Sequence, residues 1–292
     1  MIDKCCAVVV SYNPTQQIIE NVKALIPQVA EILIVDNGSD AGSLRILEEL
    51  SKESAVTVEH NRSNLGIATA LNQGVKYASE RGYEWLATFD QDSLAPVNYL
   101  QTMFDAYSSC EDHKLVAIIA PRYQTNTGII SFSKEEDRGQ NFSKIKTTMT
   151  SGNLVKIDTF RKVGLFEDSF FIDYVDHEFC LRVRSKGLLI IESPKSLLFH
   201  ELGSSATHRF MNTDIITTGH SATRRYYKYR NMIITCKKYY WFDPLLVIKY
   251  FKSLIFEPLK IIFLEDEKLL KLKYIYTGII DGIKSIQGEI IR

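Results

Sequence analysis

The chain of 292 residues lacks a net charge, a regular cysteine pattern and a long apolar leader. It has 35 basic and 35 acidic side chains, and this balance argues against a dedicated nucleic-acid binder, which shows a basic excess. Its five cysteines are odd in number and include no C-x-x-C pair. They predict reduced thiols in a cytoplasmic protein, without a disulfide framework or a zinc site. The first apolar run, residues 5–10, is too short for a signal peptide and predicts no export.

Charge is unevenly distributed along the chain. Residues 1–210 carry 27 acidic and 21 basic side chains, whereas residues 211–292 carry 8 acidic and 14 basic ones. We therefore predict a domain over 1–210 and a basic, apolar helical extension over 211–292. A basic extension of this kind favours anionic lipid or a phosphate-bearing partner.

Apolar runs and helical stretches alternate through the first hundred residues. We expect buried strands at 5–10, 31–35, 55–60 and 84–89, and helices between them at 15–30, 41–52 and 66–81. This alternation predicts a doubly wound α/β sheet with right-handed crossovers. Further along we expect a helix at 96–109, a strand at 115–120 closed by Pro121, and a hairpin or loop over 122–150.

The last eighty residues predict helices. Residues 221–240 are basic and aromatic, and residues 244–264 are strongly apolar with four charges. At 100° per residue these charges fall within an arc of about 140°. This favours an amphipathic helix in a membrane interface over a spanning one. The alternative is a helix packed on the domain or on a second subunit, and Pro258 should kink the helix or end its first half.

Polar residues follow the predicted strands, where α/β sheets bind ligands. Asp90 and Asp92 end the strand at 84–89, and two carboxylates in one turn can share a hard divalent cation that suits a diphosphate. Asp36 ends the strand at 31–35 and could accept hydrogen bonds from a nucleobase or ribose, or it could form an Asx-turn or helix cap.

A third motif runs from Asn64 to Gly74. Its small residues Gly66, Ala70 and Gly74 recur every four positions and would let a helix approach its sheet or a ligand closely. Asn64 could cap this helix, and Asn72 could bond a neighbouring loop. The alternative is tight helix packing without ligand contact.

Taken together, these motifs resemble those of the inverting glycosyltransferases of family 2, which have the GT-A fold. The resemblance rests on residues 8–13, 35–39, 64–74 and 89–93 in the family's order, and it covers about residues 5–205. It implies a GT-A doubly wound mixed sheet, a nucleoside-diphosphate sugar donor and Mg²⁺ or Mn²⁺. It also implies donor-nucleotide contacts from a set comprising Ser11, Asn13, Asp36, Asn64, Gly66, Asn72 and Asp90.

Residues 170–182 resemble the family's acceptor-side motif, in which an Asp six residues before an Arg is the catalytic base. Asp176 matches this base by its spacing to Arg182. Val175 replaces the usual Glu, and the resulting motif is similar to that of bacterial rhamnosyltransferases. Asp173 is expected to contact acceptor or phosphate. Glu178 and Arg182, four residues apart, predict a helical ion pair.

Two later segments complete the resemblance. His200 matches an H-x-x-G-S segment whose His joins the metal and diphosphate site, so the implied metal ligands are Asp92, Asp90 and His200. The basic residues Arg224 and Arg230 match an R-x-Y-Y-x-x-R-N run and could contact acceptor phosphate, donor phosphate or anionic headgroups. The alternative is a solvated basic helix with core tyrosines.

The resemblance implies transfer of a sugar to a polysaccharide or lipid-linked glycan acceptor, at the inner face of the cell membrane. The preferred donor is dTDP-β-L-rhamnose, with UDP-galactofuranose or a UDP-hexose as the alternative. A homodimer through the C-terminal face stays open, and no nucleic acid is expected. Two remote alternatives are a nucleotidyltransferase and a non-catalytic membrane-associated binding protein.

Overall fold

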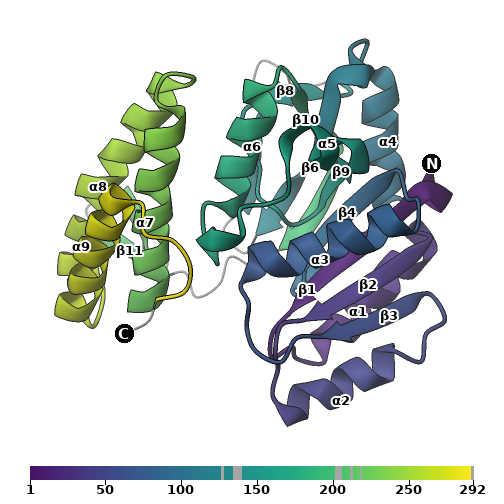
Figure 1. The fold of residues 1–292 in the computed structure, drawn as a ribbon, viewed down its shortest axis with the longest axis horizontal. Helices are drawn as coiled ribbons and strands as arrows, with labels where there is room; N and C mark the ends of the chain where they lie inside the picture. Colours follow the sequence, from purple (N-terminus) through teal and green to yellow (C-terminus); the bar gives the residue numbers. More distant parts are fainter. Residues whose placement is uncertain (126–127, 134–139, 201–205, 211–212, 218, 291–292) are drawn as a thin grey trace. The chain divides into compact units, whose positions relative to one another are not determined.

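The computed structural model describes residues 1–292 except 126–127, 134–139, 201–205, 211–212, 218 and 291–292. The chain forms two compact units (Figure 1). The first unit contains residues 1–168 and 175–201, and the second contains residues 169–174 and 202–292. The observed division therefore differs from the predicted boundary at residue 210. In addition, the short segment 169–174 belongs to the second unit, which the sequence did not predict.

A mixed sheet organises the first unit. Its strands are β1 Cys5–Ser11, β2 Glu31–Asp36, β3 Val56–His60, β4 Trp85–Asp90, β5 Ser93–Leu94, β6 Val116–Thr125, β7 Gly128–Ile130, β8 Ser143–Ile145, β9 Asn153–Lys156 and β10 Leu189–His200. The order is β3-β2-β1-β4-β9-β6-β10-β5, with β7 beside β6 and β8 beside β10. The first four strands pair in parallel, and β9 is antiparallel to both β4 and β6. The predicted doubly wound α/β fold is confirmed.

Helices cover both faces of this sheet because its central strands are apolar on both sides. They are α1 Gln17–Leu25, α2 Ala41–Leu50, α3 Ile67–Glu80, α4 Tyr99–Ser109, α5 Ile157–Val163 and α6 Val175–Ser185. On one face, side chains of α1, α2 and α4 form a core with Ala7 and Val9 of β1. On the other, α3 lies so close to β1 that a Cβ on Gly74 would be 2.5 Å from Val8 Cγ2. The predicted role of Gly74 in close packing is thus observed.

The strand predicted to end before Pro121 continues through it to Thr125. Proline lacks the N–H that a ladder needs, and it fits where a neighbouring strand bulges. The pairing of β6 with β10 shifts register there, because Ala120 pairs with Glu192 whereas Arg122 pairs with Leu197. The bulge in β10 therefore accommodates the proline that sequence reasoning treated as a stop.

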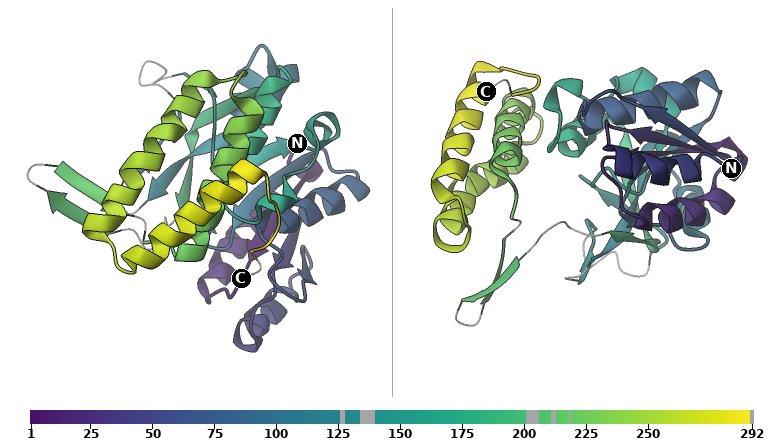
Figure 2. Two further views of the ribbon diagram at one scale, coloured as in Figure 1. Left: turned by 60° about the vertical axis from the view of Figure 1, so that its left-hand side comes forward. Right: turned by 90° about the horizontal axis from the view of Figure 1, so that it is seen from below.

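Three helices form most of the second unit, α7 Ala222–Tyr239, α8 Pro244–Leu264 and α9 Lys268–Lys284, with a hairpin of β11 Ala206–Phe210 and β12 Thr213–Thr217. The three helices lie side by side (Figure 2). Gly278 lets α9 approach α7, because a Cβ there would lie 2.5 Å from the Tyr226 carbonyl oxygen. Pro258 does not end α8, whose bounds match the predicted 244–264. Among the described residues, no helix has the length and apolarity needed to cross a membrane.

All five cysteines are buried free thiols. Burial raises the pKa of Cys6 and of Cys180 to about 12. These two thiols are therefore protonated at neutral pH and are poor nucleophiles.

Candidate active site

The parallel strands bring the predicted donor residues to one edge of the sheet. In the register of β1, β2 and β3, Ser11 pairs with Asp36 and Asp36 pairs with His60. On the other side of β1, Val10 pairs with Asp90 of β4. The carboxyl ends of four strands thus place Ser11, Asp36 and Asp90 in neighbouring positions, as the motif order predicts.

Asp36 is almost completely buried and is held by two groups. Its carboxylate accepts from the Ser39 backbone N–H at 3.2 Å and contacts His60 Nδ1 at 3.0 Å. The Asx-turn interpretation of Asp36 therefore describes part of its bonding. Sequence reasoning left His60 unassigned, although its place at the end of the adjacent strand β3 was the signal that could have identified it.

The loops beyond β2 and β3 are joined through the amide of Asn37. Its Nδ2 donates to Asn64 Oδ1 at 3.0 Å and to the Gly66 carbonyl at 3.1 Å, and its Oδ1 accepts from the Leu65 N–H. Asn64 Oδ1 also accepts from the Gly66 N–H. Gly66 precedes α3 with a φ of 84°, in the left-handed region that favours glycine. Asn64 and Gly66 therefore shape the start of α3.

The loop after β1 is fixed by side-chain contacts on both sides. Asn13 Oδ1 accepts from the Asp40 N–H at 2.8 Å. Gln91, the middle residue of the acidic motif, accepts from the Tyr12 N–H and donates to its carbonyl. Sequence analysis missed this role of Gln91 because it considered only the two flanking carboxylates. Ser11 Oγ is buried and has no hydrogen-bond partner among the described residues.

Asp90, Asp92 and His200 form a candidate metal site. Each offers a ligand atom, and these atoms lie within 4.8 Å of one another. His200 Nδ1 lies 3.4 Å from Asp92 Oδ1 and 2.8 Å from Ser93 Oγ. The last contact follows from sheet register, because β5 pairs Ser93 with His200 of β10. Two carboxylates and one imidazole are a donor set that fits Mg²⁺ or Mn²⁺. The G-S residues of the predicted H-x-x-G-S segment lie outside the described residues.

Ser151 supports the acidic turn from behind. Its hydroxyl accepts from the Asp90 backbone N–H at 3.0 Å and contacts Ser93 Oγ at 2.7 Å. It precedes β9, which is antiparallel to β4 and so reaches the carboxyl end of that strand. No sequence motif marks Ser151, since its position depends on the insertion of β9 between β4 and β6.

Asp176 lies in the first turn of α6 and is partly exposed. Its Oδ1 accepts from the His177 N–H at 2.8 Å. It lines a small cavity of about 10 Å³ with Thr88 of β4 and Thr150. Burial raises the pKa of Tyr123, and the charges of Asp176 and Asp90 raise it further, so both carboxylates lie near this tyrosine.

The other acid of α6 has a structural partner. Glu178 is fully buried and accepts from Arg182 at 2.6 Å. Arg182 also donates to the Val163 and Leu165 carbonyls. The predicted i,i+4 ion pair is confirmed, and it ties α6 to the chain after α5. Asp176 is therefore distinguished from Glu178 by exposure as well as by spacing.

Asn72 forms hydrogen bonds to a neighbouring loop. The motif itself suggested this role, whereas the resemblance implied a contact to the donor. Its amide donates to the Phe166 carbonyl and to Asp168, and its Oδ1 accepts from the Phe166 N–H at 2.9 Å. The side chain is buried. These bonds fix the chain ahead of residue 169 against α3.

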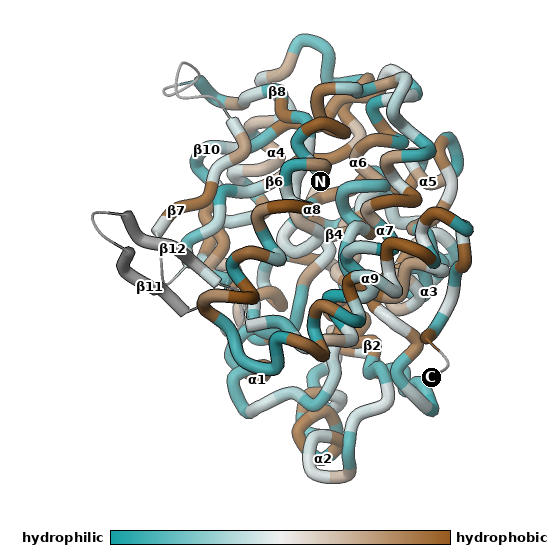
Figure 3. Tube along the Cα trace, turned by 90° about the vertical axis from the view of Figure 1, so that its left-hand side faces the viewer, coloured by the Kyte–Doolittle hydropathy of each residue, from teal (hydrophilic) through white to brown (hydrophobic). Residues whose placement is uncertain are grey.

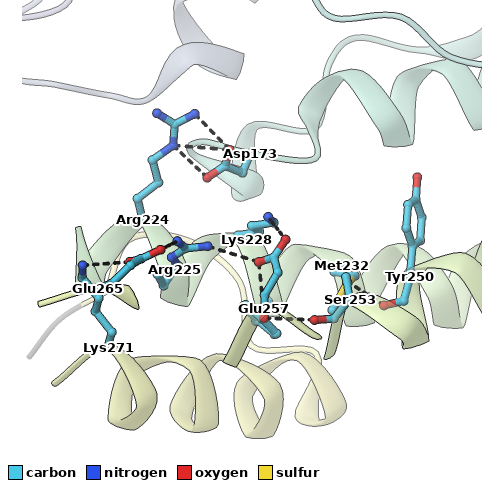
Figure 4. A network of polar contacts seen from close by, with 11 residues as sticks. Asp173, Arg224, Arg225, Lys228, Met232, Tyr250, Ser253, Glu257, Glu265 and Lys271 are labelled. Atoms are coloured by element: carbon cyan, nitrogen blue, oxygen red, sulfur yellow. Dashed lines mark hydrogen bonds and ion pairs between the residues drawn. The ribbon is translucent and has the colours of Figure 1, made fainter. Parts of the chain in front are cut away.

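Two of the predicted acceptor or phosphate contacts are paired with each other in the second unit. Arg224 donates from Nε and Nη2 to the Asp173 carboxylate at 3.1 and 3.2 Å (Figure 4). Arg224 keeps 42% of its side chain exposed. An anion that reached its guanidinium would compete with Asp173.

The prediction that Arg230 contacts phosphate needs correction. Its side chain is fully buried, and its guanidinium donates to the carbonyls of Ser169 and Gly288. A bulky anion cannot reach a buried cation whose donors already bind backbone oxygens. Arg230 therefore stabilises the second unit.

Buried and partly buried ion pairs join the helices of this unit (Figure 4). Arg225 of α7 is bound by Glu257 of α8 at 3.1 Å and by Glu265 at 2.7 Å. Lys228 shares Glu257, and Lys271 of α9 shares Glu265. The basic run at the start of α7 is thus used largely for internal pairing.

Comparison with known proteins agrees with this geometry. Residues 6–168 match the model of glycosyl transferase family 2. The chain is 30% identical to the dTDP-rhamnosyl transferase RfbF of Shigella flexneri over 97% of this chain and 96% of that protein. It is also 23% identical, over 65% of this chain and 64% of that protein, to a hexosyltransferase of low-salt glycan biosynthesis, Agl10 of Haloferax volcanii.

Solved structures share the fold at low identity. The S. aureus TarS 1–349 complex with UDP-GlcNAc has a TM-score of 0.65 at 14% identity and covers 97% of this chain and 81% of that one. GalNAc-T7 with UDP, GalNAc and Mn²⁺ has a TM-score of 0.63 at 14% identity, over 97% of this chain and 56% of that one. The fold is that of the GT-A glycosyltransferases, and the chain belongs to glycosyl transferase family 2, as an enzyme that takes its sugar from a nucleotide donor.

Proposed function

We propose that this glycosyltransferase moves L-rhamnose from dTDP-β-L-rhamnose to a hydroxyl of a growing polysaccharide or lipid-linked glycan. The near full-length similarity to a dTDP-rhamnosyl transferase supports this donor. The observation that carries the chemistry is the convergence of Asp90, Asp92 and His200 beside the strand ends. Mixed oxygen and nitrogen ligands next to a nucleotide-binding edge suit a diphosphate leaving group.

The donor nucleotide would bind at the carboxyl ends of β1, β2 and β4. The Asp36 carboxylate, oriented by His60 and the Ser39 N–H, would accept from the nucleobase or ribose. Ser11 Oγ lies beside it as a further polar group for the nucleotide. Asp90 would contact the ribose or the metal through water.

Asp92, Asp90 and His200 would hold Mg²⁺ or Mn²⁺. When bound, the cation supplies positive charge that offsets the negative charge developing on the departing diphosphate. Ser93 Oγ contacts His200 Nδ1 and so helps to orient the imidazole beside the Asp92 carboxylate.

Asp176 would act as the general base. Its carboxylate would take the proton of the acceptor hydroxyl while that oxygen bonds to the anomeric carbon. The bond from this carbon to the diphosphate oxygen breaks in the same displacement, so configuration inverts. Partial exposure at the start of α6 leaves Asp176 accessible to an acceptor, unlike the buried Glu178.

We further propose that the enzyme works at a membrane surface through α8. Large apolar side chains on this helix are exposed, including Leu245 at 72%, Ile255 at 63% and Phe263 at 74%, and Figure 3 shows hydrophobic stretches along it. Its one acid, Glu257, pairs with cations of α7, whereas its three lysines, Lys249, Lys252 and Lys260, are exposed.

Anionic headgroups complement such a face. A two-fold dimer through α8 would instead bring lysines of one copy near those of the other without an acid from this helix between them. The charge of the exposed α8 face therefore favours anionic lipid over a second subunit as its partner.

Thermal unfolding in the presence of dTDP, UDP, GDP or ADP, each with and without Mn²⁺, tests the donor. A ligand at about 100 times its dissociation constant adds roughly 2.7 kcal/mol of stability. We expect selective stabilisation by dTDP that requires Mn²⁺. Selective stabilisation by UDP would keep the transferase and replace the donor with UDP-galactofuranose or a UDP-hexose. No response to any nucleotide would contradict the donor site and favour a non-catalytic binding protein.

A further inference from the structure

The segment that leads to the proposed base has an unfavourable backbone. Phe171, Asp173 and Tyr174 have φ values of 61°, 61° and 66°. Left-handed conformations are uncommon outside glycine and persist where surrounding contacts hold them. Val175 begins α6 directly after this segment, and Asp176 is its second residue.

A pair of neighbouring residues in α7 binds the backbone of this segment. Asn231 is fully buried, and its Nδ2 donates to the carbonyls of Phe170, Ile172 and Asp173 at 2.8, 2.9 and 2.9 Å. One amide thus binds three carbonyl groups across the strained turn. Arg230 binds two carbonyls at the start of this segment, those of Ser169 and Phe170.

Arg230 orients that amide. Its Nε donates to Asn231 Oδ1 at 3.0 Å, which directs Nδ2 to the carbonyl oxygens. Its Nη2 donates to the Ser169 carbonyl at 2.7 Å. Arg230 and Asn231 are neighbours in sequence, and both are completely buried. Their bonds therefore belong to one rigid arrangement within the second unit.

Aromatic contacts and Arg224 complete the support without replacing it. Phe171 stacks on Tyr227 with ring centroids 4.9 Å apart, and Tyr174 meets Tyr250 edge to face at 5.2 Å. These contacts bind side chains, and Arg224 binds the Asp173 carboxylate. Asn231 and Arg230 bind the backbone carbonyls of the turn, two of which also accept from backbone N–H groups, Phe170 from Ile172 and Ser169 from Gly288.

We propose that Asn231, oriented by Arg230, is a positioning residue for sugar transfer that acts through Asp176. Its amide maintains the left-handed turn over 170–174 and hence the backbone from which α6 and its base begin. This inference rests on the proposed role of Asp176 as the base. It also gives the R-N pair of the 224–231 motif a function that requires no phosphate.

Asn231→Asp is the sharpest variant, because the carboxylate has nearly the same shape and can still accept from Arg230 but cannot donate to carbonyls. Asn231→Ala removes both functions. Thr235→Val is the matched control, since Thr235 lies one turn further along α7, is buried, and has an Oγ1 without a partner among the described residues.

Turnover is measured as dTDP release from dTDP-β-L-rhamnose in water with Mn²⁺, alongside thermal stabilisation by dTDP and Mn²⁺. We expect both Asn231 variants to lower kcat roughly 10–100-fold, as misplaced catalytic groups do. Stabilisation by dTDP should stay at its wild-type value, because the donor residues lie in the first unit. Hydrogen exchange in residues 169–174 should become faster, and Thr235→Val should change none of these.

The same substitutions in an Asp176→Asn background show whether Asn231 acts through the base. We expect no further loss there, since two residues that act as a unit are not additive. Three results would each overturn the positioning role while leaving Asp176 as the base. The first is a double variant whose turnover falls by the product of the two single losses. The others are a loss of dTDP stabilisation that matches the loss of turnover, and wild-type turnover in Asn231→Asp. Wild-type turnover in Asp176→Asn alone would instead remove the base assignment, and this inference with it.

Discussion

The exposed carboxylates at the strand ends of the first unit contrast with the buried carboxylates that join the helices of the second unit. In the first unit, Asp90, Asp92 and Asp176 are partly or largely exposed beside the strand ends. In the second, Glu265 is buried between Arg225 and Lys271, and Asp281 is buried and accepts from Tyr226.

This difference separates chemistry from support. Accessible carboxylates can still bind a cation or take a proton, whereas a carboxylate buried between two cationic side chains mainly fixes its surroundings. On α8 of the second unit, lysines and apolar side chains are exposed, whereas its acid Glu257 pairs with cations of α7. The strand ends of the first unit are therefore suited to the donor, and the exposed side chains of α8 have the charge that the proposed membrane role requires.

The largest expected effect is on the proposed base, Asp176. Asp176→Asn should lower turnover about 10²–10⁴-fold, because loss of a general base typically has this magnitude. Stabilisation by dTDP and Mn²⁺ should be retained. Initial rates of dTDP release and thermal unfolding measure the two quantities. A parallel loss of nucleotide stabilisation would place Asp176 in donor binding instead.

The outward lysines of α8 should dominate membrane affinity. Replacing Lys249, Lys252 and Lys260 together by Gln should weaken binding to vesicles containing phosphatidylglycerol by roughly 3 kcal/mol, since each cation near an anionic surface contributes about 1 kcal/mol. Vesicle flotation measures this change, and neutral phosphatidylcholine vesicles should show little binding.

A control triple variant uses exposed lysines of the first unit, Lys76, Lys144 and Lys162. Equal losses in both triple variants would contradict a specific role of α8. If Phe256→Glu converts a dimer to a monomer in a protein that never binds vesicles, the exposed face belongs to a second subunit.

The proposed metal ligands should govern nucleotide binding. Asp92→Ala is expected to abolish the Mn²⁺-dependent part of stabilisation by dTDP, up to roughly 2.7 kcal/mol at a ligand concentration about 100 times the dissociation constant. Asp105→Ala, at an exposed position of α4, provides the control. Thermal unfolding that keeps its Mn²⁺ dependence in Asp92→Ala would exclude Asp92 as a ligand.

A smaller effect is expected from His220 in the second unit. Burial, followed by the charge of Arg224, lowers the pKa of His220 from 6.5 to about 4. Because the folded protein binds this proton less readily than the unfolded chain, folding favours neutral His220. This contribution to the free energy of unfolding is fully present above pH 6.5 and is lost as the pH falls toward 4. His220→Gln should reduce this acid sensitivity by on the order of 1–2 kcal/mol, allowing for partial exposure.

Chemical denaturation at pH 7 and pH 4 measures that difference. His113→Gln in the first unit is the control. An unchanged pH dependence in His220→Gln would show that other groups cause the acid sensitivity.

Much of the first unit could be predicted from sequence because local patterns determine it. Strand ends at Asp36 and Asp90 follow from apolar runs, and parallel register then brings their side chains to one edge. The resemblance to family 2 supplied the roles of Asp176 and His200. His60 and Gln91 escaped notice since their contacts depend on neighbouring strands and loops.

The second unit was less predictable because its charges have non-local partners. A run of arginines has the same appearance whether it meets phosphate or buried carbonyls, so Arg230 was misassigned. The bounds of α8 followed from its apolar pattern, but the inward orientation of Glu257 depends on Arg225 and Lys228. Pro121 likewise ended a strand in the prediction because the bulge that accommodates it lies seventy residues away in β10.

The stereochemistry of the first-formed product tests the central claim most directly. A single displacement assisted by Asp176 predicts inversion, so dTDP-β-L-rhamnose should give α-L-rhamnose with water as the acceptor. Proton NMR recorded before the free sugar mutarotates distinguishes the two anomers. Initial formation of the α anomer is the expected result. Initial formation of the β anomer would contradict a direct displacement and the role assigned to Asp176.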